Sequence, residues 1–155
     1  MEYLLTVIRQ TRENFIRLIE SSTLEELNAI PAGFNNNIIW NFGHIIASEQ
    51  VLCYLSANVD PIMDMEFINA YRKGTKPSGF IGQAQIDTMK ELMRSSIIKL
   101  EEDLKQHLFT SYNAFKTHYG VELKTTADAV QFFSSHDAFH YGYASAIKRI
   151  INNNK

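Results

Sequence analysis

Apolar residues recur every three or four positions along most of this chain, and that spacing restricts its fold more than any other feature. Such a period places apolar side chains on one stripe of an α-helix. It predicts four long helices, at about residues 2–21, 36–58, 83–108 and 126–153. No segment shows the alternating pattern that is typical of a strand. We therefore expect an all-α fold, a four-helix bundle.

Capping residues support these helix positions. Thr23 and Glu26 form a capping-box pattern that predicts a short turn of helix after the first long one. Thr125 and Asp128 have the same spacing at the start of the last helix. Gly43 lies inside the second helix, where glycine costs about 1 kcal/mol relative to alanine. This cost suggests that a neighbouring element packs closely there.

The connection between the second and third helices is long and irregular. Residues 59–82 contain two of the three prolines and three of the seven glycines. A connection of this length in a small bundle is typical of a lid, a binding loop or an irregular cap. A second connection covers residues 109–124. With 155 residues the chain fits one domain, which we expect to cover residues 1–155.

Composition excludes several classes of function. The net charge is −2 and no basic face is apparent, so we expect neither nucleic-acid binding nor membrane binding. A single cysteine, Cys53, rules out an internal disulfide. The N-terminus lacks the features of a signal peptide, and no apolar run reaches the ~18 residues of a membrane span. We therefore expect a cytoplasmic protein.

Two histidines interrupt the apolar stripe of the last helix. His136 and His140 are four residues apart, so they share a face and their rings can converge on one metal ion. Zincin proteases have this spacing, but they need glutamate where this chain has Asp137. No His, Asp, Glu or Cys follows His140, so a third ligand must come from upstream. The candidate is His44, on the core-facing stripe of the second helix.

Three histidines on two facing stripes favour a divalent-metal site over three separately hydrogen-bonded core residues. Burying three imidazoles costs desolvation free energy three times, and a metal ion offsets that cost by using their lone pairs. Three protein ligands with open coordination positions are typical of catalytic sites, whereas structural sites are normally closed by four. No further residue can be assigned a catalytic role from the sequence.

Other polar residues are weaker candidates for the site. Cys53 is expected to point away from His44 and to pack in the core. His107 is expected at the surface, in the last turn of the third helix, whereas His118 could approach the site on a loop. Glu49 should not be a ligand, because it lies about 140° around the helix from His44.

Two further groups of residues leave alternatives open. Asp137 either holds a neighbouring histidine or faces solvent. Tyr143 is either a core aromatic residue or a hydrogen-bond donor to a bound oxygen. The remaining candidates are basic residues of the long connection, which either meet an anionic substrate or form a solvated loop: Arg72, Lys73 and Lys76.

The order and placement of these motifs resemble the DinB superfamily. The segments that carry the resemblance are "WNFGHIIASEQ" on the second helix and "HDAFHYGY" on the last, and the likeness spans nearly the whole chain. It implies a four-helix bundle, often a homodimer, with a divalent metal such as nickel or zinc held by His44, His136 and His140. One departure is Tyr143, where family members often have glutamine.

The resemblance also implies a class of reaction. Some members are thiol transferases or isomerases that use low-molecular-weight thiols, and many have no assigned reaction. We therefore expect a metal-dependent thiol S-transferase or hydrolase that acts on a small-molecule substrate. The alternative is a non-catalytic bundle that binds a metal or a small molecule.

Overall fold

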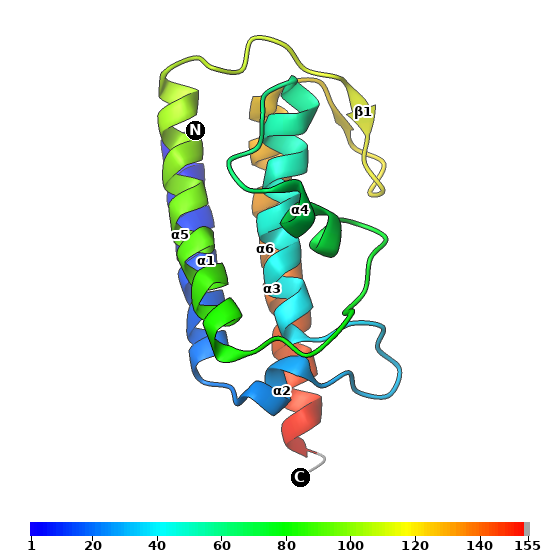
Figure 1. The fold of residues 1–155 in the computed structure, drawn as a ribbon. Helices are drawn as coiled ribbons and strands as arrows, with labels where there is room; N and C mark the ends of the chain where they lie inside the picture. The colour runs from blue at the N-terminus through cyan, green and yellow to red at the C-terminus, as the bar shows by residue number, and fades with distance from the viewer. Residues whose placement is uncertain (154–155) are drawn as a thin grey trace.

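Four long helices form the body of the computed structural model, which describes residues 1–153 (Figure 1). The first and last long helices begin and end close to their predicted positions, and the third begins where it was predicted. The four are α1 (Glu2–Glu20), α3 (Ile38–Glu49), α5 (Gln83–Lys105) and α6 (Thr126–Asn153). The prediction of an all-α four-helix bundle is confirmed, with one small hairpin as an addition.

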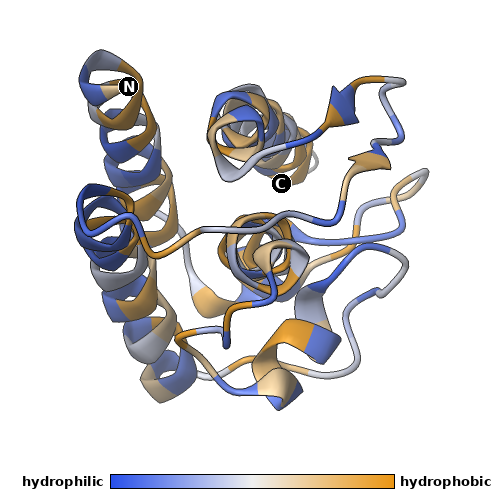
Figure 2. Ribbon diagram, turned by 90° about the horizontal axis from the view of Figure 1, so that it is seen from above, coloured by the Kyte–Doolittle hydropathy of each residue, from blue (hydrophilic) through white to orange (hydrophobic). Residues whose placement is uncertain are grey.

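The helix directions explain why one connection is so long. α1 and α6 run down the bundle, whereas α3 and α5 both run up it (Figure 1). α3 and α5 are parallel neighbours, so the chain between them must return along the whole bundle. Seen from above, α3 lies between α5 and α6, and the returning connection covers its outer side (Figure 2). No helix of residues 1–153 is long and apolar enough to cross a bilayer.

The connections carry small elements of their own. The predicted short helix is α2 (Leu24–Asn28), and the long connection contains α4 (Met65–Tyr71). The connection before α6 contains a hairpin of β1 (Phe115–Lys116) and β2 (Glu122–Leu123), so the expectation of no strand was wrong. Each strand has only two residues, too few for an alternating pattern to show in the sequence.

The predicted caps form as expected. The Thr23 side chain accepts from the Glu26 amide at 3.2 Å, and the Glu26 carboxylate accepts from the Thr23 amide at 2.9 Å. Thr125 and Asp128 make the equivalent pair at 3.1 and 3.0 Å. α5 ends at Lys105, before the predicted position. His107 is therefore exposed beyond the helix, with φ at 56°, and not in its last turn.

α3 is the most buried helix, and it is irregular at its C-terminal end. Every side chain from Ile38 to Gln50 is buried, as its nearly continuous apolar sequence requires. The predicted second helix continues as a π-helical turn at Gln50–Tyr54 and a 3-10 turn at Leu55–Ala57. π-helical turns are rare and occur frequently at functional sites. This one follows directly after the buried Glu49.

Candidate metal centre

The three predicted histidines meet between α3 and α6, the two helices with the most extensive mutual packing. One ring nitrogen from each of His44, His136 and His140 lies within 4.8 Å of the other two. The ring centroids are 4.5 Å apart for the pairs that include His140 and 5.1 Å for His44 and His136. Small side-chain rotations would bring all three nitrogens to the roughly 2.0–2.1 Å of a bond to one zinc ion.

His44 is held by the last residue of α4. Its Nδ1 donates a hydrogen bond to the Tyr71 carbonyl at 2.7 Å, which makes Nε2 the acceptor nitrogen, and the Ser48 hydroxyl lies 3.4 Å from that atom. The Trp40 ring stacks on the imidazole at 4.7 Å between centroids. The Tyr71 ring lies against Gly43, where an added Cβ would be 2.5 Å from the nearest ring atom. The expected close approach at Gly43 is thus an approach by α4.

We expect Gly43→Ala to destabilise the protein and weaken metal binding. A methyl group cannot fit beside the Tyr71 ring, and overpacking of this kind costs about 1–3 kcal/mol. Displacing Tyr71 also moves the carbonyl that orients His44, and losing such a partner lowers metal affinity about 10–100-fold. Thermal unfolding and a zinc titration measure the two effects.

The matched control for this substitution is Gly142→Ala. Gly142 lies in α6 with nothing within 4 Å of an added Cβ, so alanine there should stabilise the helix by about 1 kcal/mol. If Gly43→Ala stabilised the protein as Gly142→Ala does, the close contact with Tyr71 would be contradicted. Combining Gly43→Ala with Tyr71→Ala should relieve the clash.

His140 is oriented by an amide of α3. Its Nδ1 donates to Asn41 Oδ1 at 2.7 Å. The Asn41 amide nitrogen donates to Asn36 Oδ1 at 3.0 Å and to the Asn37 carbonyl at 2.8 Å, which fixes the amide with its oxygen toward His140. The Nε2 atom of His140 is therefore the acceptor. His44 and His140 thus both have Nδ1 engaged by a fixed acceptor, the arrangement that is typical of metal-binding histidines.

The third ring, His136, has no such partner. Its buried Nδ1 lies 4.0 Å from Asp137 Oδ1, and neither atom has a hydrogen bond. Buried polar atoms without a partner are uncommon in native proteins and call for an explanation. A small rotation of the imidazole would join the two atoms, in the carboxylate–histidine arrangement that orients metal ligands.

The ionisation of the rings fits a divalent cation. Burial lowers the pKa of His44 to about 4, with a further contribution from His136. Burial also lowers the pKa of His140 to about 2, and the neighbouring His136 and His44 add to the effect. Near neutral pH both rings are uncharged, and a metal ion needs neutral imidazole as its ligand. The donor set of three imidazole nitrogens suits nickel, copper or zinc.

A buried ionic network lies directly behind this cluster, and the apolar pattern of the sequence did not predict it. Arg12 of α1 donates to Asp137 Oδ2 at 2.8 Å, to Glu49 Oε2 at 2.5 Å and to Ser96 Oγ at 3.2 Å. All four side chains are essentially inaccessible to solvent, and each comes from a different long helix. Asp137 therefore does not face solvent, and that alternative was wrong.

The carboxylates of this network stabilise the positive charge of Arg12. Burial by itself lowers the pKa of the Arg12 guanidinium, but the Asp137 and Glu49 carboxylates raise it above its ordinary value. Gln50 donates to Glu49 Oε1 at 2.8 Å and so occupies its other oxygen. One signal in the sequence could have revealed the network. Arg12 stands on the apolar stripe of α1 that also includes Ile8 and Phe15.

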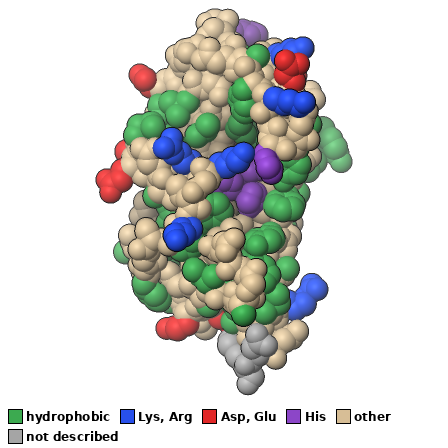
Figure 3. All heavy atoms as spheres, turned by 90° about the vertical axis from the view of Figure 1, so that its right-hand side faces the viewer, with side chains coloured by type: hydrophobic (Ala, Val, Ile, Leu, Met, Phe, Trp, Pro, Cys, Tyr) green, Lys and Arg blue, Asp and Glu red, His purple; other side chains and the backbone are tan. Residues whose placement is uncertain are grey.

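The three histidines open into a pocket of about 770 Å³. Figure 3 shows histidine side chains in a hollow of the surface, with Lys and Arg side chains beside it. The lining includes Arg72 and Lys73 after α4, and Lys116 and His118 of the hairpin. Among the described residues no aspartate or glutamate lines this pocket. The open side of the cluster is therefore basic and accessible.

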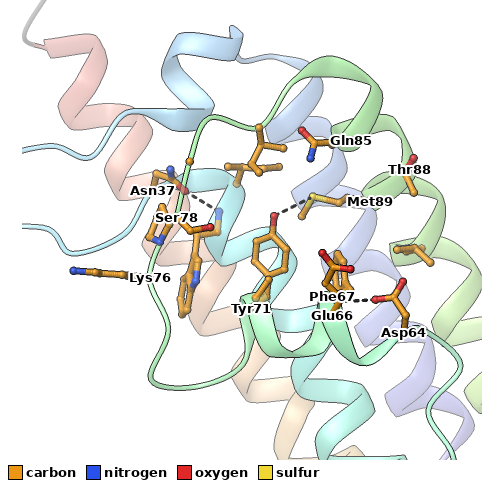
Figure 4. A pocket seen from close by; sticks show the side chains of 17 residues that line it. Asn37, Asp64, Glu66, Phe67, Tyr71, Lys76, Ser78, Gln85, Thr88 and Met89 are labelled. Atoms are coloured by element: carbon orange, nitrogen blue, oxygen red, sulfur yellow. Dashed lines mark hydrogen bonds between the residues drawn. The ribbon is translucent and has the colours of Figure 1, made fainter.

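A second cavity, of about 420 Å³, lies on the other side of Tyr71 and Trp40. Figure 4 shows the Tyr71 hydroxyl pointing toward Met89, whose sulfur accepts its hydrogen bond at 3.8 Å. Lys76 lines this cavity and not the pocket of the histidines, whereas Arg72 and Lys73 line the histidine pocket. The basic residues of the long connection are thus divided between the two.

The remaining candidates lie outside the cluster. Cys53 is fully buried in the core, where burial raises the pKa of its thiol, so it is a packing residue as predicted. Glu49 binds Arg12 and is not near the histidines' common point. Tyr143 packs 5.4 Å from Phe34 between ring centroids and does not line the histidine pocket. Its interpretation as a packed aromatic residue is the one that fits.

Comparisons with known proteins agree with this architecture. A crystal structure of a conserved protein from Enterococcus faecalis superimposes with a TM-score of 0.68, covering 98% of this chain and 96% of that one. At 12% sequence identity, this likeness concerns the fold alone. No curated protein matches the chain significantly. The family model of the DinB superfamily matches residues 8–144, most of the chain, and the protein therefore belongs to the DinB superfamily.

Proposed function

We propose that this protein is a metal-dependent enzyme that holds one divalent cation, nickel or zinc, on His44, His136 and His140. The observation that carries the proposal is the setting of the three imidazoles. They lie together at the bottom of an open pocket and not inside a sealed core. Three ligands beside a space for substrate match the catalytic pattern, in which coordination positions remain open.

The neighbouring residues would prepare the site for a cation. Tyr71 and Asn41 fix the tautomers of His44 and His140 before any ion binds. Behind His136, the buried network holds two acidic groups, Glu49 and Asp137, against the single guanidinium of Arg12. This excess of acidic groups favours a positive charge on the histidine side of Asp137.

The pocket favours thiol transfer over hydrolysis. A divalent ion held there would lower the pKa of a bound thiol or water and so supply a nucleophile near neutral pH. A water molecule starts from a much higher ordinary pKa than a thiol, and among the described residues no carboxylate lines the pocket to take its proton as a general base. A thiol has an ordinary pKa of about 8.5, so it ionises without one. Its sulfur then bonds to the electrophilic carbon, and the leaving group departs with the electron pair.

A non-catalytic bundle is the alternative. In that case the histidines would hold an ion for stability, or the pocket would bind a small molecule without converting it. Among the described residues, the exposed His118 is the only other histidine in the pocket lining, and no carboxylate accompanies it there for proton transfer. The homodimer and the cytoplasmic location stay predictions.

The proposal is tested by metal loading followed by an activity screen. The purified chain is stripped with a chelator, dialysed against nickel or zinc, and analysed for bound metal by mass spectrometry. Loaded and stripped protein are then assayed for conjugation of small thiols to chlorodinitrobenzene, which releases chloride, and for ester hydrolysis. We expect one equivalent of metal and a thiol-transfer rate that chelation abolishes.

Two other outcomes decide against it. A chain that binds no ion under any of these conditions would contradict the metal site itself. One bound equivalent that raises the melting temperature without turnover of any thiol or ester would favour the non-catalytic alternative.

A further inference from the structure

The basic side chains at the mouth of the histidine pocket point to the chemical class of its ligand. We propose that this pocket binds an organic anion, a carboxylate or phosphate ester with an apolar body, whose charge is held by Arg72 and Lys73. The inference rests on the proposed function only in taking this pocket as the substrate site.

Among residues 1–153, three basic side chains that line this pocket stand unpaired. The side chains of Arg72, Lys73 and Lys116 make no ion pair or hydrogen bond within residues 1–153, although all three line one pocket. Most other basic side chains are paired, as Arg94 is with Glu13 at 2.9 Å. Unpaired cations gathered at one mouth, in a chain of net charge −2, leave a local field that only a ligand or counter-ions can neutralise.

The acidic residues nearby do not neutralise this field. Glu122 stands opposite Lys116 in the hairpin, but its carboxylate is paired with Lys124 at 3.1 Å. Asp64 and Glu66 of the long connection line the second cavity and not this one. A pocket with walls of one sign of charge concentrates ligands of the opposite sign.

The remaining residues that line the pocket indicate the chemistry of the uncharged part of the ligand. Apolar side chains from the π-helical and 3-10 turns after α3 line the pocket, and aromatic rings from the hairpin and α6 complete it: Val51, Leu52, Leu55, Phe115 and Phe132. This composition, a mostly apolar wall with a few charged groups, is usual for pockets that bind small molecules. The volume, about 770 Å³, suits a molecule with both an apolar body and a charged end.

The test compares a carboxylate with its uncharged amide and adds a phosphate ester. Phenylbutyrate, its uncharged amide phenylbutanamide, and phenethyl phosphate are titrated calorimetrically into metal-loaded and chelator-treated protein. We expect either anion to bind about tenfold more tightly than the amide, from two exposed charge pairs. The comparison between carboxylate and phosphate distinguishes the two sources of the anion.

Charge-neutralising variants locate the effect. In Arg72→Gln/Lys73→Gln the preference for the anions should fall to about twofold or less. The matched control is Arg17→Gln/Arg149→Gln, which removes the same charge from exposed, unpaired positions outside the pocket. It should keep the preference.

The outcome is independent of metal binding. The same titrations in His136→Ala protein report the charge preference without the complete ligand set, so a failed metal site leaves the inference standing. Equal binding of acid and amide, no binding of either anion, or an unchanged preference in Arg72→Gln/Lys73→Gln would overturn it.

Discussion

Replacing His136 by alanine is expected to lower the affinity for nickel or zinc by more than about 100-fold. Loss of a partner that merely orients a ligand already costs about 10–100-fold, and His136 would supply one of the three bonds itself. The remaining pair, His44 and His140, lie on different helices and would hold the ion with two bonds. Such a site should release its ion on dialysis.

Thermal unfolding measures this loss without any assay of activity. An ion at about 1,000 times its dissociation constant stabilises the folded chain by about 4 kcal/mol, which for this length corresponds to roughly 8–16 °C. At the same ion concentration, a variant with about 100-fold weaker binding should gain only about 1.4 kcal/mol. The shift on adding zinc should therefore shrink to about a third.

His118→Ala is the matched control, because His118 is an exposed imidazole of the same pocket that is not part of the cluster. It should respond to zinc as the unchanged chain does. Equal responses of His136→Ala and the unchanged chain, with full occupancy in both, would mean that the ion does not use His136.

The second large effect concerns Arg12. We expect Arg12→Met to cost about 3–5 kcal/mol, because it leaves two fully buried carboxyl groups, Glu49 and Asp137, without their counter-charge. The melting temperature should fall by roughly 6–20 °C. The deficit should shrink as the pH falls, since a protonated carboxyl group needs no counter-charge. Burial already raises the pKa of Glu49.

Two comparisons isolate the buried charges. Arg9→Met removes an arginine that pairs with Glu101 near the surface, and it should cost no more than about 1 kcal/mol. Replacing Arg12, Glu49 and Asp137 together by apolar residues should recover much of the lost stability, as buried ion pairs generally cost nearly as much as they contribute. If Arg12→Met were as stable as Arg9→Met, the network would have no structural role.

The long helices were predictable because their evidence is local. Apolar spacing and caps such as Thr125 with Asp128 lie within the helices that they define. The π-helical turn at Gln50–Tyr54 was not predictable, since it changes the backbone without changing the apolar period. α4 was missed although Asp64 caps it, because prolines and glycines dominate the segment around it.

The candidate site was predictable only in part, because some of its contacts join residues that are far apart in the sequence. Histidines on apolar stripes stand out, because an ionisable ring in a core position needs a partner. Arg12 broke its stripe in the same way, but its partners come from α3, α5 and α6, and pairing across helices cannot be deduced from one chain. The hydrogen bond from His44 to the Tyr71 carbonyl could not be predicted at all, because every residue has a backbone oxygen and the sequence does not show which one accepts.

The placement of some of these residues on the long helices and of others on the connections has an evolutionary consequence. The three histidines and the network behind them stand on the long helices, whereas Arg72, Lys73 and Lys116 stand on the two segments that join them. If the pocket binds a ligand as proposed, mutation can remodel its preference by exchanging or lengthening these joining segments, while the three-histidine framework stays intact. Relatives that share the histidines should accordingly diverge most in what they bind.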